Sequence, residues 1–189
     1  MKSDAARIPS SSQTVGPYFC IGLQSMIARA PAIALETPGM VAIEGQVSDR
    51  NGAPVPDAML EFWSAATEST AGGTELESAG FPTGFRRAIT ENDGRFSVII
   101  ERPETIASGD NTRQAPHFMV LVFARGLLRQ LLTRVYLGGP PCGEMDPVLS
   151  RVPEERRETL IAAEDERRIN VFQWNVKLQG PDETVFFAW

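Results

Sequence analysis

An alternation of apolar and polar residues begins near residue 41 and continues, with interruptions, to the end of the chain. A period of two is typical of β-strands that bury one face. The segments that show it, or that are apolar on both faces, are 41–47, 58–62, 85–90, 96–100, 117–124, 127–137, 169–178 and 185–187. Two polar turn sequences, Asp49–Gly52 and Glu91–Gly94, each lie between two of these segments. We therefore predict that each turn joins its flanking strands into a β-hairpin.

Two later segments have the character of central strands. Residues 117–124 are apolar at nearly every position, as in a strand that is covered on both sides. Residues 127–137 form a second long strand pattern directly after Arg125 and Gly126. Only residues 154–163 have a convincing helical pattern, and Pro153 suits the first turn of that helix. Seven or more strands with one short helix predict an all-β fold, a β-sandwich.

The first 40 residues show little sustained periodicity. Glycine and proline recur there, at Gly16, Pro17, Pro31, Pro38 and Gly39. Such a composition favours an extended arm, which needs another surface to lie on. We therefore predict an N-terminal arm at 1–40 and one sandwich domain at 41–189. The length of 189 residues is sufficient for one domain whose core needs no disulfide or structural metal.

Composition and charge exclude several classes of protein. The formal net charge is −6, and an acidic chain is a poor partner for a nucleic-acid backbone. No apolar run approaches the roughly 20 residues that cross a bilayer, and the first residues lack the apolar core of a signal peptide. We expect a cytoplasmic protein without membrane contact. The two cysteines, Cys20 and Cys142, are far apart in sequence and are expected to be free thiols.

The sequence contains no motif of a complete catalytic site within this one chain. His117 is the only histidine, and no serine lies in a Gly-x-Ser-x-Gly turn, which argues against a hydrolase triad. Gly72 and Gly73 lack the lysine and hydroxyl residue of a phosphate-binding loop. Taken alone, His117 is expected to be a structural histidine, because a metal site needs several ligands.

Arg134 is the most informative single residue. Strand alternation places it on the same face as Leu132 and Tyr136, so a permanent cation projects among apolar neighbours. Its partner is either an internal carboxylate or an anionic or phenolic substrate in a pocket. The sequence Thr14–Tyr18 has a similar pair of interpretations, since Gly-Pro forms ordinary surface turns and also lets the backbone approach a ligand closely.

Several separate motifs resemble one known family in the same order along nearly the whole chain. They are 12–19, 45–52, 115–126, 133–136, 156–162 and 179–187. Together they are similar to the α-type chains of the intradiol, non-haem iron dioxygenases. The resemblance implies an enzyme of α and β chains with similar sandwich folds, several αβ units in a larger oligomer, and O₂ as co-substrate. It also implies that the β chain binds Fe(III) through two tyrosinates and two histidines, and that the complex cleaves 3,4-dihydroxybenzoate between its hydroxyl groups to a carboxymuconate.

The same resemblance implies that this chain has no iron site of its own. Where the iron-binding chain has a His-x-His pair, this chain has His117 and Met119, at vestigial ligand positions, and a thioether is a poor ligand for hard Fe³⁺. The only tyrosines, Tyr18 and Tyr136, lie outside the loops 64–84 and 101–114 where tyrosine ligands are expected. One histidine cannot supply a site with two.

In this family the α chain contributes residues to part of the substrate pocket on its partner. The resemblance carries this role onto Thr14, Gly16, Pro17 and Arg134, and more weakly onto Tyr18. It also gives the arm a surface on the β subunit, and we expect three aromatic residues near the C-terminus to be buried between subunits. These are Phe186, Phe187 and Trp189.

Two other interpretations remain. Residues 45–63 followed by 93–96 also look like a prealbumin-like sandwich, which predicts a non-enzymatic module that binds carbohydrate or protein. The Thr-x-Gly-Pro-Tyr motif at 14–18 and the Thr-Arg-x-Tyr motif at 133–136 argue against that module. A degenerate homologue that has lost its partner is not separable by sequence.

Overall fold

The computed structural model describes residues 10–14, 16, 18–29, 32–64, 84–108, 112–138 and 146–188. The strands are β1 (Met40–Ser48), β2 (Met59–Trp63), β3 (Phe85–Ile89), β4 (Arg95–Glu101), β5 (Ile106–Ser108), β6 (Thr112–Gln114), β7 (His117–Phe123), β8 (Leu131–Leu137), β9 (Ile161–Glu164), β10 (Val171–Gln173) and β11 (Val176–Lys177). The helices are α1 (Tyr18–Arg29) and the 3₁₀ segments η1 (Leu149–Arg151) and η2 (Glu154–Leu160). The predicted all-β class is confirmed.

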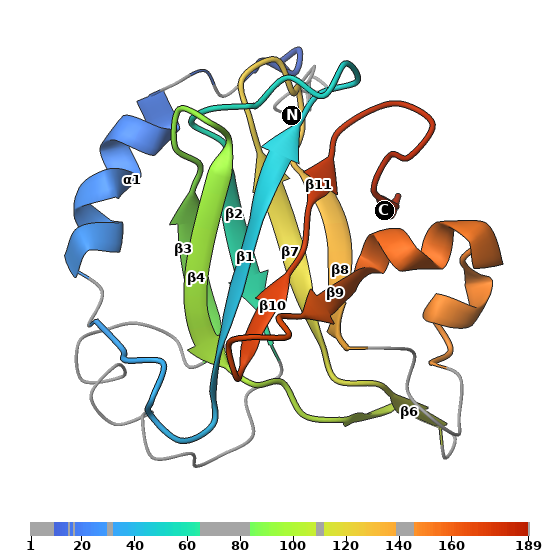
Figure 1. Cartoon of the computed structure of the whole chain (residues 1–189). Helices are drawn as coiled ribbons and strands as arrows, with labels where there is room; N and C mark the ends of the chain where they lie inside the picture. The colour runs from blue at the N-terminus through green and yellow to red at the C-terminus, as the bar shows by residue number, and fades with distance from the viewer. Residues whose placement is uncertain are drawn as a thin grey trace, which may run out of the picture.

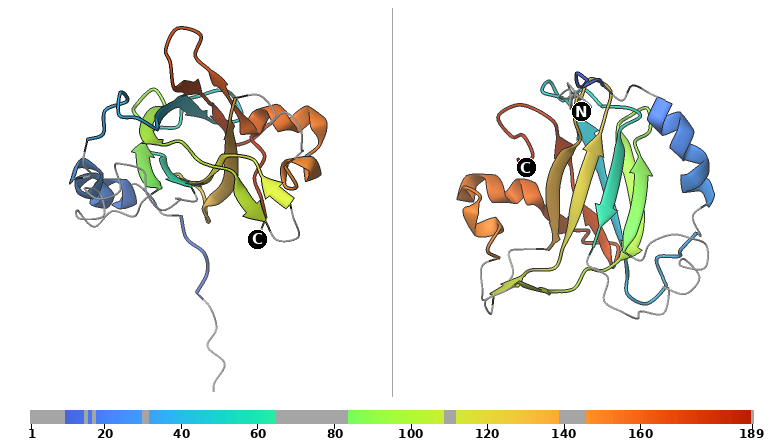
Figure 2. Two further views of the ribbon diagram at one scale, coloured as in Figure 1. Left: turned by 90° about the horizontal axis from the view of Figure 1, so that it is seen from below. Right: turned by 180° about the vertical axis from the view of Figure 1, so that it is seen from behind.

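The sheet curls into two facing layers. The strands follow the order β11-β1-β10-β9-β8-β7-β2-β3, and β4 pairs with β1. Strand β9 connects the layers, because it is antiparallel to β10 on one side and parallel to β8 on the other. In Figure 1 the layer of β4, β1 and β10 lies in front of β2, β7 and β8, and the view from behind in Figure 2 brings β7 and β2 forward. The β5 and β6 strands form a separate ribbon within the predicted loop 101–114.

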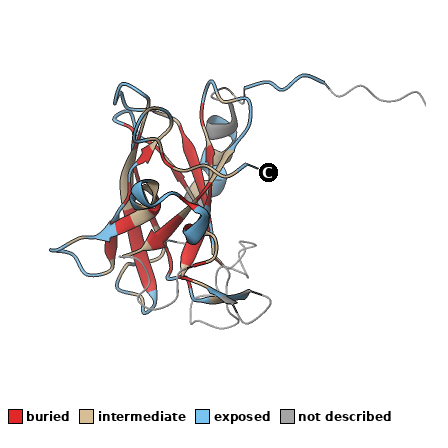
Figure 3. Ribbon diagram, turned by 90° about the vertical axis from the view of Figure 1, so that its right-hand side faces the viewer, coloured by how far each residue is buried: buried red, intermediate tan, exposed pale blue. Residues whose placement is uncertain are grey.

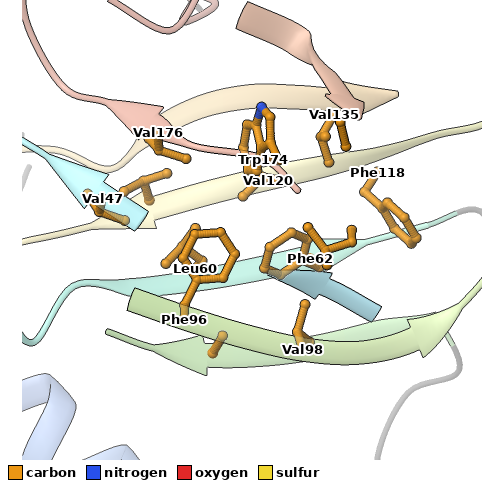
Figure 4. Close-up of a cluster of buried hydrophobic side chains, with 14 of the residues drawn as sticks. Val47, Leu60, Phe62, Phe96, Val98, Phe118, Val120, Val135, Trp174 and Val176 are labelled. Carbon is orange, nitrogen blue, oxygen red and sulfur yellow. The ribbon is translucent and has the colours of Figure 1, made fainter. Parts of the chain in front are cut away.

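The core lies between the two layers. Phe62 of β2 contacts Phe118 of β7 edge-on at a ring-centroid distance of 6.3 Å, and contacts Trp174 at 6.5 Å. Phe96 of β4 approaches the same ring from the opposite layer at 6.1 Å. Figure 4 shows these side chains converging with the valines of β1, β7 and β8. Buried residues follow the strands, while the turns that join them are exposed (Figure 3). Burial of this aromatic and aliphatic surface is the main contribution to the stability of the fold.

The two predicted hairpins are wrong. Strand β1 pairs with β4, β10 and β11, whereas β2 pairs with β3 and β7. The turns themselves form, since Gly52 N–H donates to Asp49 O at 3.1 Å and Gly94 N–H donates to Glu91 O at 2.9 Å. Each turn therefore carries the chain from one layer to the other. Alternation identifies the face that is buried, but both layers bury their inner faces in the same core, so it does not identify the neighbouring strand.

Four other element boundaries differ from the prediction. The helix expected at 154–163 ends at Leu160 as a 3₁₀ segment, because Ile161 begins β9 beside Tyr136 of β8. The strand expected at 127–137 begins only at Leu131. The strand expected at 169–178 is divided into β10 and β11, and 185–187 forms only an isolated bridge between Phe187 and Leu132.

The N-terminal arm contains a helix that the sequence did not predict. Helix α1 lies beside the layer edge formed by β3 (Figure 1). It exposes Ile21 and Met26, whose side chains are 64% and 46% accessible. Gly16 precedes it with φ of +60°, a conformation that glycine adopts without strain. Within the residues that the structure describes, no helix is long and apolar enough to span a membrane.

Candidate functional site

Strands β7 and β8 bring the predicted site residues of the domain together. In their antiparallel register His117 is opposite Tyr136, and Met119 is opposite Arg134. Directly opposed residues share a face of the sheet. Because Phe118 points into the core, the side chains of its two neighbours on β7 lie on the outer face. The two vestigial ligand positions and the predicted substrate-binding arginine are therefore neighbours.

Asp146 is the central acceptor of this region. Its carboxylate is 1% exposed, and it accepts hydrogen bonds from the Tyr136 hydroxyl at 3.1 Å and the Ala115 N–H at 2.8 Å. It also accepts the N–H groups of Val148 and Leu149, at 2.8 and 2.9 Å. Burial raises the pKa of this carboxyl, but the hydrogen bonds outweigh burial and hold the pKa below its ordinary value. The sequence analysis missed Asp146, although aspartate often accepts hydrogen bonds from backbone N–H groups two or three residues later in a turn.

His117 is buried and neutral at physiological pH. Its Nδ1 donates a hydrogen bond to the Ala115 carbonyl oxygen at 2.7 Å, since that oxygen can only accept. Burial lowers the pKa of the imidazole, the bond to Ala115 opposes that change, and the nearby charges of Arg134 and Asp146 act in opposite directions. The predicted structural role of His117 agrees with this satisfied environment.

Tyr136 is a protonated phenol in this site. Burial raises its pKa to about 12, although the hydrogen bond with Arg134 acts in the opposite direction. The hydroxyl donates to Asp146, and the ring lies 5.5 Å from the His117 ring between centroids. A phenol with this pKa is not a tyrosinate near neutral pH.

The described hydrogen-bond partners of Arg134 are two neutral side chains, the Gln114 amide and the Tyr136 phenol. Its Nη1 donates to the Gln114 side-chain oxygen at 2.9 Å, and the guanidinium is partly buried. Among the described residues, no carboxylate forms an ion pair with Arg134. The internal carboxylate that sequence analysis left open as the partner is thus not found in this part of the chain. Gln114 was also missed, because nothing in the sequence relates a residue of β6 to one of β8.

The N-terminal motif lies at another point of the same strand pair. The Thr14 hydroxyl accepts a hydrogen bond from Gly126 N–H at 2.9 Å, at the turn between β7 and β8. Gly16 N–H donates to the same hydroxyl at 3.5 Å. Pro17 and the side chain of Tyr18 lie outside the described residues. The structure brings Thr14 and Gly16 together and shows no contact of either with Arg134.

The residues of this face do not fit a ferric ion. The Asp146 carboxylate already accepts four hydrogen bonds, one of them from the Tyr136 hydroxyl, and Met119 offers only a thioether. The Arg134 cation on the neighbouring strand would repel a further positive charge. In the part of the chain that the structure describes, no three His, Cys, Asp or Glu residues cluster as metal ligands.

A hollow on the other layer does not contribute to this site. It encloses about 460 Å³ over β1, β4 and β10 and is lined mainly by polar side chains. Those side chains pair with one another and with their surroundings: Glu44 forms an ion pair with Arg168 at 2.7 Å and accepts a hydrogen bond from Gln173 at 3.0 Å. The polar groups at this hollow are thus largely used within the chain.

The aromatic C-terminus packs partly against its own chain. Phe186 contacts the main core, and Phe187 contacts the smaller cluster around Tyr136 and Leu160. Phe187 N–H also donates to Leu132 O at 2.8 Å. Both rings are only partly buried in the single chain, so their burial against a partner stays a prediction, and Trp189 lies outside the described residues.

Comparisons with known proteins agree with the sequence resemblance. The family model described as Dioxygenase matches residues 15–180. The chain is 40% identical to the protocatechuate 3,4-dioxygenase alpha chain of Burkholderia cepacia, over 93% of this chain and 95% of the other. It is 34% identical to the protein of the same name from Pseudomonas putida, over 93% and 94% of the two chains.

Solved structures show the same fold at low sequence identity. A dioxygenase domain from Streptomyces sp. SirexAA-E matches with a TM-score of 0.52 and 21% identity, over 92% of this chain and 99% of that one. Catechol 1,2-dioxygenase from Pseudomonas arvilla C-1 matches with a TM-score of 0.52 and 20% identity, over 89% and 71% of the two chains.

Proposed function

This chain belongs to the dioxygenase family, and we propose that it is the α subunit of a protocatechuate 3,4-dioxygenase. In this proposal it pairs with an iron-bearing β subunit, in a larger oligomer, and the complex cleaves protocatechuate with O₂ to 3-carboxy-cis,cis-muconate. Support comes from two relatives of that name that match over nearly their whole length. We also propose that the complex is cytoplasmic.

We also propose that the two subunits have different roles in catalysis. The described donor atoms on the outer face of β7 and β8 are a thioether and groups already hydrogen-bonded to one another, which do not fit Fe(III), so we assign the iron to the partner. Bound there, Fe(III) would supply the activation of the catecholate toward O₂. This chain supplies groups that bind and orient the substrate.

The observation that carries the proposal is that Arg134 has no direct ion pair in the described part of the chain. A partly buried guanidinium whose described hydrogen-bond partners are an amide and a phenol can still meet an anionic ligand with its charge. Protocatechuate carries a carboxylate, which a guanidinium recognises with charge-assisted hydrogen bonds. The arm residues Thr14, Gly16 and Pro17, with Tyr18 as a weaker candidate, are proposed to form another part of the pocket wall.

Replacement of the arginine tests this role. We expect Arg134→Ala, co-expressed with the β subunit, to retain iron and to lose about 10- to 150-fold in kcat/KM for protocatechuate, which corresponds to about 1.5–3 kcal/mol. Arg134→Lys should recover part of the loss, because it keeps the charge but not the planar fork. Unchanged kcat/KM together with a lower melting temperature would instead assign Arg134 a purely structural role.

The non-enzymatic sandwich module is disfavoured by the same comparisons, since identity of 40% extends over 93% of the chain. Reconstitution also tests the degenerate homologue. If the chain forms no complex with the β subunit from the same organism, the α-subunit proposal is wrong.

A further inference from the structure

The contact between Arg134 and Gln114 joins two separate parts of the fold. Gln114 ends β6, and the next residue, Ala115, is held by its N–H donated to the buried Asp146 carboxylate at 2.8 Å. The same carboxylate accepts the hydroxyl of Tyr136, two residues after Arg134 on β8. Asp146 therefore fixes the backbone next to Gln114 and the side chain of Tyr136 next to Arg134. Gln114 is not a surface side chain that meets the arginine by chance.

A second arginine on the same sheet shows the contrast. Arg87 of β3 forms an ion pair with Glu61 of β2, with Nε and Oε1 2.7 Å apart. Its guanidinium also lies over the Phe85 ring at 4.8 Å. That arginine is paired directly with a carboxylate, whereas the described hydrogen-bond partners of Arg134 are the Gln114 amide and the Tyr136 phenol. Among the described residues, Arg134 thus has no direct ion pair, and the Asp146 carboxylate is linked to it only through the Tyr136 hydroxyl.

The geometry leaves the arginine ready for a carboxylate. Gln114 uses one hydrogen of Nη1, and a guanidinium has five donors in a fixed plane. The amide oxygen fixes the orientation of that plane without competing for its charge. A glutamate of nearly the same shape would compete, because two opposite charges at this distance attract strongly in a partly buried site.

We propose that Gln114 is a positioning and specificity-determining residue, which orients Arg134 and keeps its charge available for the carboxylate of the substrate. This inference rests on the proposed function of Arg134. It predicts that the side chain at position 114 governs discrimination between catechols with and without a carboxylate, and that it acts only through Arg134.

Gln114→Glu in the reconstituted αβ complex tests the inference. We expect KM for protocatechuate to rise about tenfold or more, the lower range for loss of a charge-assisted hydrogen bond. The rate with catechol, which has no carboxylate, should change less than about twofold. Gln114→Ala should raise KM less than Gln114→Glu, because it removes the orienting bond but adds no competing charge. Gln179→Glu, an exposed change of the same charge, is the control and should match the wild type.

The double variant separates this inference from the function on which it rests. In an Arg134→Ala background, Gln114→Glu should have no further effect on either substrate. If Arg134→Ala itself leaves kinetics unchanged, the proposed substrate-binding role of Arg134, on which this inference rests, fails. If Arg134→Ala lowers kcat/KM but Gln114→Glu keeps the wild-type ratio for the two substrates, or lowers both rates equally, the role of Gln114 is overturned.

Discussion

The neutral imidazole of His117 makes stability depend on pH. Burial is the main cause of its lowered pKa in the folded protein. Because the unfolded chain then binds a proton more readily, the free energy of unfolding is highest above the ordinary value of 6.5 and falls as pH decreases through the folded pKa. His117 is the only histidine in the sequence, so few other groups of this chain titrate in that range.

We therefore expect wild type to lose more stability than His117→Asn between pH 7.5 and pH 5.5. Asparagine keeps a donor near the Ala115 carbonyl and removes the titration. Thermal melting of both αβ complexes at the two pH values measures the difference, because histidines of the partner are common to both. An equal loss in the two complexes would show that His117 is not the group responsible.

The environment of Arg134 could be predicted only in part from the sequence. Alternation along 131–137 correctly placed it on the same outer face as Tyr136. It could not identify Gln114, because that contact joins two strands separated by 20 positions and depends on the path of the ribbon between them. Asp146 is similar, since its bonds to the nearby Val148 and Leu149 N–H groups have a local signal but its bonds to Ala115 and Tyr136 do not.

At the scale of elements, the backbone of β1 touches the strand beside it at Gly45. A Cβ at this position would lie 1.7 Å from the Trp174 carbonyl oxygen, which is backbone and cannot rotate away. Trp174 is itself fixed, because its side chain packs in the core and its Nε1 donates to Thr159 O at 3.0 Å. Close approach of two backbones therefore requires glycine.

Gly45→Ala should lower the free energy of unfolding by about 3 kcal/mol or more, at the upper end for overpacked sites. The matched control is Gly22→Ala in α1, where the added Cβ meets nothing within 4 Å. That change should be neutral or stabilise by up to about 1 kcal/mol, because alanine favours a helix. Chemical denaturation of the two variants gives the comparison, and equal stability of Gly45→Ala and wild type would contradict the contact.

The positions of strands could be predicted from the sequence where alternate residues face the core. The pairing of one strand with another could not. The patterns at 41–47 and 96–100 identified β1 and β4 as strands, which pair with each other although the hairpin hypothesis assigned them other neighbours. The broken pattern after β10 has a local cause. Asn175 uses its side-chain oxygen to accept Gln46 N–H at 3.0 Å, so the ladder is interrupted while its register continues into β11.

At the scale of the whole molecule, the fold class followed from the sequence because it depends on summed features. Repeated alternation, few helices and frequent turns have few solutions other than two packed layers. Helix α1 was missed because its hydrophobic pattern is weak and glycine and proline surround it. Its Ile21 and Met26 side chains are exposed to solvent in the single chain. Exposed apolar side chains of this kind are typical of a surface that another protein covers.

We predict that α1 and the residues before it bind the β subunit. Ile21→Ser should leave the melting temperature of the isolated chain nearly unchanged, because the side chain is 64% exposed there. It should raise the dissociation constant of the αβ complex about tenfold, the effect of losing roughly 1.5 kcal/mol of apolar burial. Ile169→Ser, at a residue that is 85% exposed in the turn before β10, is the matched control. Deleting residues 1–17 should weaken assembly or activity as well. Equal dissociation constants for the two serine variants, measured by calorimetry, would show that the arm is not at the interface.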